Sequence, residues 1–145
     1  MKNTKTMLIT GGTGRGKSTM LHEYIQTLLV RNDIELLLID PKQVEFWEYR
    51  DKDNVTLVNG HFKEYIITEL KILLEDRLKA IKDKKLIIVV DEFAEVKFDK
   101  KCDLVFKWIM KNRKEMNVDL ALASQIPTVF CNTYKQNSDI IIKFQ

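Results

Sequence analysis

Residues Gly11 to Thr19 read GGTGRGKST, and this stretch is the strongest indication of the fold. It fits the pattern Gly-x-x-x-x-Gly-Lys-Ser, directly after one strand-like run and at the start of a helical segment. Glycine lets the backbone turn its N–H groups inward around phosphate oxygens, and the amino end of the following helix adds a positive dipole. The sequence therefore predicts a phosphate-binding P-loop.

The side chains of this loop have expected parts in holding a nucleotide and its metal ion. Lys17 should reach the β- and γ-phosphates, and Ser18 should place its hydroxyl on Mg²⁺. Thr19 adds a hydrogen bond to a phosphate oxygen. The predicted nucleotide site is completed by the rest of the loop: Gly11, Gly12, Thr13, Gly14, Arg15 and Gly16. ATP and Mg²⁺ are therefore the expected cofactors.

A second motif follows the apolar run from Leu86 to Val90, where Asp91 and Glu92 place two carboxylates at the end of a buried strand. Ligands bind at the carboxyl ends of strands in an open α/β sheet. We expect Asp91 to hold Mg²⁺ through water, and Glu92 to orient and deprotonate the water that attacks the γ-phosphate. Considered without the P-loop, the Asp91-Glu92 pair is equally consistent with an acidic turn or a helix cap.

Strand-like and helix-like segments alternate along the chain, which indicates a parallel sheet covered on both faces. The fold prediction is a RecA-like P-loop NTPase of the α/β class, with a five-stranded, mainly parallel sheet. The expected strands are Thr6–Thr10, Glu35–Asp40, Leu86–Val90, Val118–Ala123 and Asp139–Phe144. The expected helices are Lys17–Val30, His61–Ile81 and Asp99–Met116, with a shorter one at Val44–Tyr49. In the second helix, an apolar stripe is predicted for core packing: Ile66, Leu70, Leu73, Leu74, Leu78 and Ile81.

The strand count carries a further inference about topology. In ATPases with a catalytic Glu after the Mg²⁺-binding Asp, one more strand separates the P-loop strand from the Asp strand. Residues 118–123 can fill that position. They lead into Ser124 and Gln125, and a polar side chain there can touch the γ-phosphate or the attacking water. Gln125 is therefore a candidate catalytic residue, and an ordinary polar residue at a strand end is the alternative.

Length and composition bound the remaining possibilities. The 145 residues, 45% of them hydrophobic, predict one domain over residues 1–145. No run has the roughly 20 apolar residues that a membrane span needs, so a cytoplasmic protein is expected. Cys102 and Cys131 form no metal-ligand pattern and are expected to be buried free thiols. The net charge of +3 permits a nucleic-acid partner without requiring one. The basic run at 97–114 fits a nucleic-acid contact and a solvated helix face equally well.

Several fragments together resemble the FtsK/SpoIIIE and HerA branch of P-loop motors. They are GGTGRGKS, LLLIDPKQVEFWEY, LIIVVDEFAEV, VDLALASQIP and SDIIIKF, and they follow the family's order across nearly the whole chain. The resemblance implies an ATPase that translocates double-stranded DNA as a homo-oligomeric ring of five or six subunits. The stretch KNRKE also resembles the packaging ATPases of small tailed phages.

The resemblance also implies an arginine that reaches into the neighbouring subunit's ATP site. Arg113 is the expected residue, because it is taken to offer a free guanidinium near a strand end. Lys114 aligns with the family's arginine and is the second choice, and Arg77 is the third. No membrane-anchoring region and no winged-helix domain are visible, which fits either a bare motor, as a phage or mobile element encodes, or an excised ATPase domain.

Loop lysines are the expected contacts to the DNA backbone, which such a motor grips without reading sequence. The candidates are Lys97, Lys100, Lys101 and Lys135, and solvated loop lysines are the alternative. Viral genome packaging in the host cytoplasm, with a capsid portal as partner, is the favoured setting; chromosome or mobile-element transfer is the alternative. A small-molecule kinase would not need Glu92 and usually carries an arginine-bearing lid, and a non-hydrolysing assembly protein would not need the intact Asp91-Glu92 pair.

Overall fold

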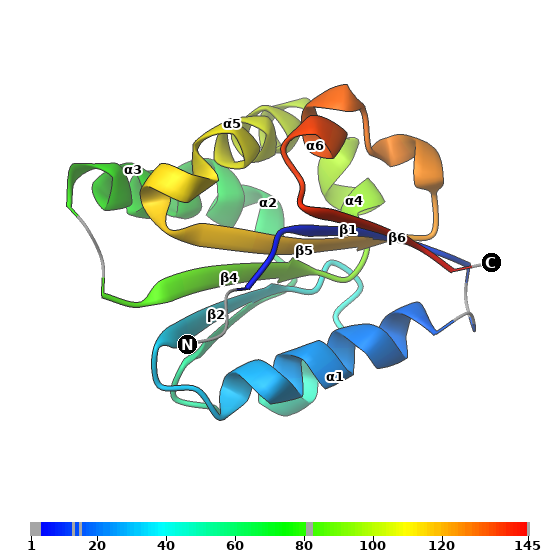
Figure 1. Cartoon of the computed structure of the whole chain (residues 1–145), viewed down its shortest axis with the longest axis horizontal. Helices are drawn as coiled ribbons and strands as arrows, with labels where there is room; N and C mark the ends of the chain where they lie inside the picture. Colours follow the sequence, from blue (N-terminus) through cyan, green and yellow to red (C-terminus); the bar gives the residue numbers. More distant parts are fainter. Residues whose placement is uncertain (1–3, 13, 15, 81–82, 145) are drawn as a thin grey trace.

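A six-stranded parallel sheet forms the centre of the computed structural model, which describes residues 4–12, 14, 16–80 and 83–144. The strand order is β3-β2-β4-β5-β1-β6, and every neighbouring pair is parallel (Figure 1). The strands are β1 (Met7–Thr10), β2 (Ile34–Ile39), β3 (Val55–Val58), β4 (Lys85–Val90), β5 (Val118–Ser124) and β6 (Ile140–Lys143). The predicted α/β class is confirmed.

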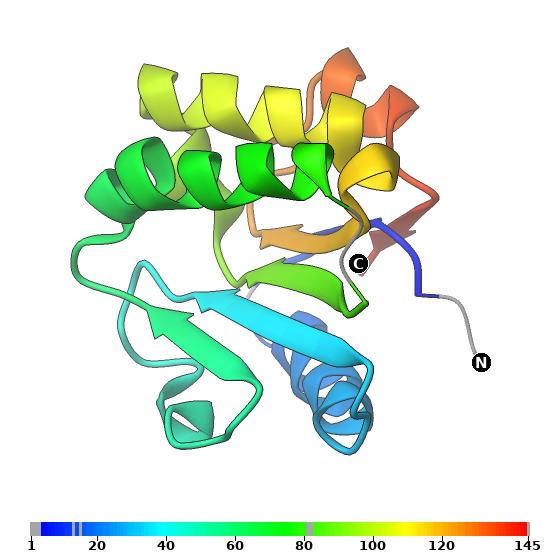
Figure 2. The same ribbon diagram turned by 90° about the vertical axis from the view of Figure 1, so that its left-hand side faces the viewer.

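Helical segments cover both faces of the sheet, as the alternation of elements predicts. On one face lie α1 (Lys17–Leu29) and the short 3₁₀ turn η1 (Trp47–Tyr49). The other face carries α2 (Phe62–Glu64), the π-helical segment η2 (Tyr65–Leu70), α3 (Lys71–Lys79), α4 (Phe93–Lys97), α5 (Lys100–Met116) and α6 (Asn132–Gln136). The 3₁₀ turn η3 (Pro127–Val129) connects β5 to α6. Figure 2 shows the sheet between α1 and the layer formed by α3 and α5.

The strand count of five is wrong, because β3 adds a sixth strand. Its four residues pair with β2 from Leu36–Val55 to Ile39–Val58 and form one edge of the sheet. Three of its four side chains are at least partly exposed, so the strand lacks the continuous apolar run by which a buried parallel strand is recognised. Pairing with β2 therefore defines β3 more than its own sequence does.

The order of the central strands agrees with the topological prediction. Strand β5 lies between β1, which leads into the P-loop, and β4, which leads into Asp91. All seven side chains of β5 are buried, because helices cover the sheet on both sides of this strand. The carboxyl ends of β1, β4 and β5 consequently meet at one edge of the sheet.

The apolar stripe predicted at 61–81 is correct for three of its residues and wrong for two others. Ile66, Leu70 and Leu74 are fully buried, whereas Leu73 and Leu78 are each 43% exposed. Arg77 continues the buried row instead, at 5% exposure. Its guanidinium donates hydrogen bonds to the carbonyl oxygens of Met116, Lys84 and Asn117, which removes the cost of burying it. Ile81 lies outside the described residues.

The long helix α5 has a local start and stop signal at its two ends. The Asp99 carboxylate accepts a hydrogen bond from the Cys102 N–H, at 3.0 Å, and so caps the amino end. Asn117, at the carboxyl end, adopts a left-handed conformation with φ of 58°. This helix carries Arg113 in its last turn, directly above the start of β5. The basic carboxyl end of α5 therefore lies at the edge of the sheet where β5 begins, and the P-loop lies at the opposite edge, where β1 ends.

Candidate active site

The P-loop leaves β1 after Thr10 and passes directly into α1 at Lys17. Gly16 has φ of 100°, a conformation that side chains rarely adopt, so glycine is required at the helix start. Gly11 is required for space, because a Cβ there would lie 2.7 Å from the Cβ of Phe144. Thr13 and Arg15, both predicted to contact the nucleotide, lie outside the described residues.

A pocket of about 360 Å³ opens at the carboxyl edge of the sheet, where the two sequence motifs meet. It is lined by Gly12, Gly14, Gly16, Lys17, Ser18, Thr19, Leu21, Lys42, Val44, Glu45, Asp91, Glu92 and Gln125. The structure thus brings together the loop, the two carboxylates and the residue after β5, although 107 positions separate Ser18 from Gln125. Their individual chemical roles stay predictions.

Lys17 lies where an ammonium group would meet nucleotide phosphates. It is 9% exposed, and its Nζ atom is 4.0 Å from the Glu92 Oε1 atom. Burial lowers the pKa of Lys17, although the nearby Glu92 and Asp91 carboxylates oppose that shift. A buried cation beside the P-loop is suited to bind an anionic ligand.

Glu92 is held by β5 and by its own following helix. Its Oε2 atom accepts hydrogen bonds from the Ser124 hydroxyl at 2.5 Å and from the Ala94 N–H at 3.1 Å. Its Oε1 atom accepts the Gln125 N–H at 2.9 Å. Gln125 therefore contacts Glu92 through its backbone, while its exposed side chain lines the pocket. The arrangement fixes a carboxylate beside Lys17, as a general base for a water molecule attacking a bound phosphate would require.

Asp91 is the better placed of the two motif carboxylates for a metal ion. Its Oδ1 atom is buried and has no hydrogen-bond partner among the described residues. Desolvation by burial, with the neighbouring Asp40 and Glu45 charges, raises the pKa of Asp91 to about 7. A divalent cation beside it would supply the missing partner and favour the ionised carboxylate.

The donor set fits a magnesium ion that also binds phosphate. Within the described ranges, no group of three or more His, Cys, Asp and Glu side chains is arranged to hold a metal ion alone. Mg²⁺ usually takes one or two protein ligands and fills its other positions with phosphate oxygens and water. Ser18 and Asp91 are the protein groups that would hold it here.

The sequence did not identify Glu45, which lines the pocket, or Ser124 and His22, which contact pocket residues without lining it. Ser124 ends β5 and contacts Glu92, while Glu45 accepts a hydrogen bond from the Ser18 hydroxyl. His22, one helical turn after Ser18, contacts Glu45 in turn, with 2.9 Å between Nε2 and Oε1. The order Asp-Pro-Lys-x-Val-Glu after β2 was a visible signal for Glu45, but nothing local indicated its partners.

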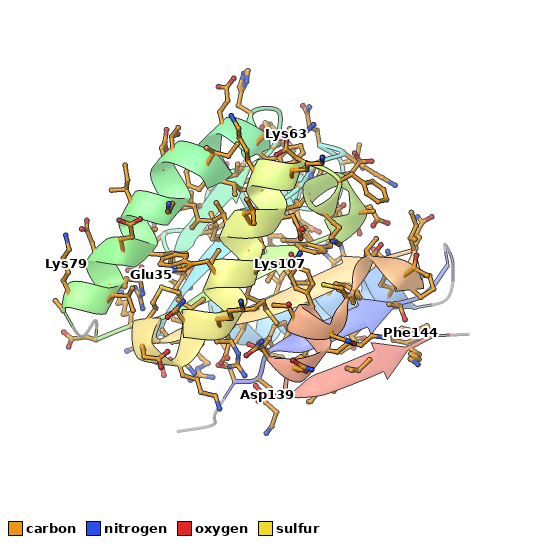
Figure 3. All side chains as sticks on the ribbon, turned by 90° about the horizontal axis from the view of Figure 1, so that it is seen from above. Glu35, Lys63, Lys79, Lys107, Asp139 and Phe144 are labelled. Atoms are coloured by element: carbon orange, nitrogen blue, oxygen red, sulfur yellow. The ribbon has the colours of Figure 1, made fainter. Side chains whose placement is uncertain are left out.

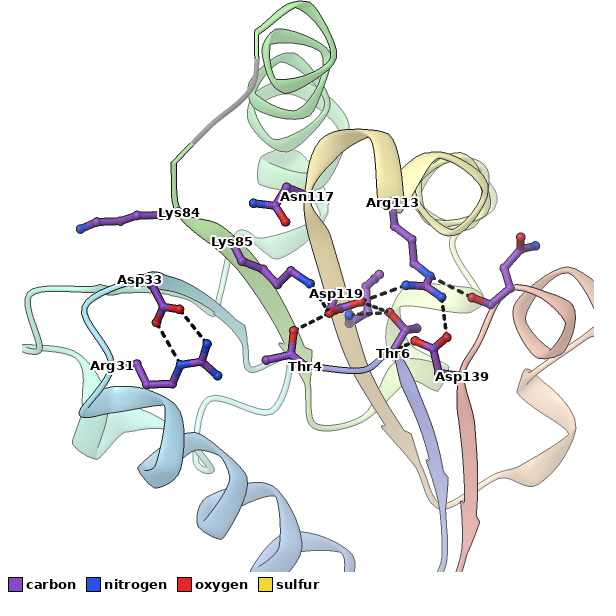
Figure 4. Close-up of polar contacts among 12 residues, drawn as sticks. Thr4, Thr6, Arg31, Asp33, Lys84, Lys85, Arg113, Asn117, Asp119 and Asp139 are labelled. Carbon is purple, nitrogen blue, oxygen red and sulfur yellow. Dashed lines mark hydrogen bonds and ion pairs between the residues drawn. The ribbon is translucent and has the colours of Figure 1, made fainter. Parts of the chain in front are cut away.

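The expectation that Arg113 offers a free guanidinium is wrong. It is 6% exposed and donates to Asp119 Oδ1 at 2.9 Å, Asp139 Oδ1 at 3.1 Å and the Asn137 carbonyl oxygen at 2.9 Å (Figure 4). The Asp119 carboxylate also accepts hydrogen bonds from Lys85 and Thr6. Each guanidinium nitrogen of Arg113 is thus engaged within the subunit, so Arg113 ties α5 to the amino ends of β5 and β6.

The other cations predicted from the sequence differ in accessibility. Lys114 is exposed beside Arg113, whereas Arg77 is buried against three carbonyl groups. Lys97 is paired with Asp103, at 3.3 Å, which reduces its availability to DNA. Lys100, Lys101 and Lys135 are exposed. Figure 3 shows the layer of α3 and α5 and the ends of β6, marked by Asp139 and Phe144.

Two further expectations concern cysteines and membrane spans. Cys102 is buried, and burial raises the pKa of its thiol to about 12. Cys131 is only partly buried, which corrects the expectation for that residue. In the described part of the chain, every helix is too short or too polar to cross a bilayer.

Comparison with known proteins finds a family match over part of the chain. Residues 1–61 match the model of the FtsK/SpoIIIE family. The protein named DNA translocase FtsK from Borreliella burgdorferi is 26% identical over an alignment that covers 88% of this chain and 20% of that protein. The chain therefore spans about a fifth of the length of the curated relatives it matches.

Solved structures share the fold at low sequence identity. The conjugation coupling protein TcpA of pCW3, in its monomer form with ATPγS, has a TM-score of 0.81 at 21% identity, covering 96% of this chain and 48% of TcpA. The DNA-packaging ATPase B204 of Sulfolobus Turreted Icosahedral Virus has a TM-score of 0.74 at 16% identity, covering 99% of this chain and 77% of B204. The chain therefore has the fold of a RecA-like P-loop ATPase domain, and its predicted resemblance to the FtsK/SpoIIIE family is confirmed.

Proposed function

We propose that this domain hydrolyses ATP and uses the energy to move double-stranded DNA. The observation that carries the proposal is the position of Glu92, whose carboxylate is fixed 4.0 Å from the P-loop lysine in the pocket. A P-loop alone supports nucleotide binding, whereas a positioned carboxylate supports water activation. The match to a family of DNA translocases supports DNA as the partner.

In the proposed mechanism, Lys17 and the backbone N–H groups of the loop bind the phosphates of ATP. Ser18 and Asp91 hold Mg²⁺, which neutralises phosphate charge when it is bound. Glu92 orients a water molecule and accepts its proton at one of its carboxylate oxygens. Thr19 and Gln125 line the same pocket, where they would contact phosphate oxygens or the attacking water.

DNA contacts are proposed for the exposed lysines at the start of α5 and on α6. Lys100 and Lys101 occupy the first turn of α5, close in sequence to the Glu92 motif. Lys135 lies on α6, which follows Gln125 along the chain. Because each group is connected to a pocket residue by a short segment, a change at the nucleotide can reach it. Phosphate contacts of this kind act independently of base sequence.

The proposed working form is a homo-oligomeric ring of five or six subunits, with Lys114 as the cation offered to a neighbour's ATP site. Viral genome packaging is the favoured setting, with a capsid portal as a partner, and it is supported by the likeness of fold to a packaging ATPase. FtsK-like transfer of a chromosome or mobile element is the alternative, and it is supported by the relatives named DNA translocase.

The test combines ATPase assays with a DNA displacement assay. We expect duplex DNA to stimulate ATP hydrolysis and the protein to displace a third strand bound to that duplex. Lys17→Ala serves as the inactive control, because it removes the main side-chain partner of the phosphates. Stimulated hydrolysis without displacement would contradict translocation, and transfer of phosphate to a small-molecule acceptor would indicate a kinase. Binding of ATP without any hydrolysis would contradict the proposed activity as a whole.

A further inference from the structure

The loop between β2 and η1 contributes a carboxylate to the pocket that no expected role accounts for. Glu45 accepts a hydrogen bond from the Ser18 hydroxyl and another from His22 Nε2, at 2.9 Å. Its side chain is 27% exposed, so it is accessible from the pocket but held on two sides.

The contact with Ser18 matters because of how a hydroxyl binds a metal ion. A serine hydroxyl has one proton and two lone pairs, and it coordinates a cation through its oxygen. The proton must then point away from the cation and needs an acceptor. A carboxylate that takes this proton orients the ligand and makes its oxygen more negative, as outer partners of metal ligands do. Glu45 is in position to do this for Ser18.

The backbone around Glu45 is built to hold this position. The Asp40 Oδ2 atom accepts the N–H groups of Glu45 and Phe46, at 2.9 and 3.0 Å. Asp40 is 1% exposed, so this cap is buried at the end of β2. Gln43 takes a left-handed conformation with φ of 64°, and its N–H bonds the Asp40 carbonyl at 3.0 Å. The loop is therefore fixed before any ligand binds.

His22 restrains the Glu45 side chain from the opposite direction. It lies four residues after Ser18 on α1, so both side chains share one face of the helix. The other ring nitrogen, Nδ1, lies 2.6 Å from the Tyr49 hydroxyl and 3.3 Å from the Glu48 Oε1 atom. Tyr49 is 3% exposed and anchors the ring to η1. The chain of contacts thus runs from Tyr49 through His22 and Glu45 to Ser18.

The charges in the pocket also favour a divalent cation near Glu45. Glu45, Asp91 and Glu92 line the pocket together with two lysines, Lys17 and Lys42. The Asp40 carboxylate adds a further acidic group whose Oδ1 atom is buried and unpartnered within the described ranges. Phosphate groups would add more negative charge, so the acidic groups require a cation to bind beside them.

We propose that Glu45 is a positioning residue for the P-loop magnesium ion. Glu45 orients the Ser18 hydroxyl that binds the ion, and His22 holds Glu45 in place. The proposal rests on the proposed function only in that the pocket binds Mg²⁺ with a nucleotide. It does not require hydrolysis or DNA. Glu45 acts through Ser18, so its removal affects the metal ion more than the nucleotide itself.

The experiment measures how nucleotide binding depends on Mg²⁺, using a fluorescent ATP analogue with either EDTA or increasing Mg²⁺. We expect Glu45→Gln to raise the Mg²⁺ concentration for half-maximal binding by about 10-fold or more, as loss of an outer partner does. Affinity measured in EDTA should not weaken, because the amide removes a negative charge near the phosphates. Glu23→Gln is the matched control, since Glu23 is an exposed carboxylate on α1 and outside the pocket lining.

Two variants of His22 test its part without altering Glu45. His22→Leu should shift the Mg²⁺ dependence in the same direction, and His22→Gln should restore part of it by supplying a donor. An unchanged Mg²⁺ dependence in Glu45→Gln overturns the proposal, as does an equal loss of affinity with and without Mg²⁺. If the wild type binds nucleotide with Mg²⁺ but never hydrolyses it, the proposed function fails while a shift in Glu45→Gln still supports this inference.

Discussion

Ser124 donates its hydroxyl proton to Glu92, and the distance between Oγ and Oε2 is 2.5 Å. Ser124 is fully buried, so this contact is shielded from solvent, and the same hydroxyl accepts the Ile126 N–H at 3.0 Å. The carboxylate proposed as the base is thus positioned by the strand next to its own. Changes in the segment after β5 can therefore reach Glu92 directly.

Ser124→Ala should lower kcat about 10-fold while the KM for ATP changes little, since a misplaced base slows chemistry without affecting binding. Ser124→Thr, which keeps the hydroxyl, should retain more activity. Steady-state ATPase measurements on both variants provide the check. Equal KM and kcat changes in Ser124→Ala, or no advantage for threonine, would show that the hydroxyl only supports packing.

Glu92→Gln should still bind ATP with Mg²⁺ but hydrolyse it about 10² to 10⁴ times more slowly, because the amide cannot accept the proton of water. Equilibrium binding and single-turnover hydrolysis separate the two effects. Asp91→Asn is the matched comparison and should weaken Mg²⁺-dependent binding instead. Normal turnover per bound ATP in Glu92→Gln would exclude this residue as the base.

Arg113→Ala should destabilise the fold by about 1 to 3 kcal/mol, because buried Asp119 loses one of its two cationic partners and keeps only Lys85. Asp119 is only 2% exposed, so solvent cannot replace the guanidinium. Lys114→Ala, one residue away on the exposed face, is the control and should change stability by about 0.5 kcal/mol or less. Denaturant unfolding followed by circular dichroism measures both. Wild-type stability in Arg113→Ala would mean that the cluster contributes nothing.

Asp139 should make stability depend on acid pH. Burial opposes its ionisation, but the Thr6 N–H and Arg113 outweigh this and lower the pKa of Asp139 below its ordinary 3.8. The stability that ionised Asp139 contributes to the fold is therefore fully present above its unfolded pKa of 3.8. It is lost as the pH falls through the lower pKa of the folded state. Asp139→Asn should be less stable at neutral pH, with the difference shrinking in acid. Urea unfolding over this range, with the exposed Asp51→Asn as control, tests it.

Lys114→Ala should reduce ATP turnover in assembled rings roughly 10-fold or more, which is less than the 10³ to 10⁵ of an arginine finger. Its own ATP site stays intact. Mixing it with Glu92→Gln subunits, which carry a normal Lys114, should restore part of the activity. Assembly is confirmed separately by mass measurement of the mixed rings. Full activity of Lys114→Ala rings, or no recovery in confirmed mixtures, would contradict a role across the interface.

The amino-acid sequence alone predicts the P-loop, the two carboxylates after β4 and the parallel α/β class. These features are local: the glycines, Lys17 and Ser18 are contiguous, and Asp91 directly follows an apolar run. Even the position of β5 between β1 and β4 could be predicted, because a catalytic Glu after the Asp implies that topology. Short-range patterns of this kind need no knowledge of partners distant in the chain.

The groups that those residues contact became apparent only in the folded protein. Arg113 looked free in the sequence, but folding surrounds it with Asp119, Asn137 and Asp139 from other elements. The pairs Ser124–Glu92 and Ser18–Glu45 likewise join residues 32 and 27 positions apart. The physical reason is that a parallel sheet brings the ends of distant strands together, and burial then makes each polar group require a partner that its neighbours in sequence do not supply.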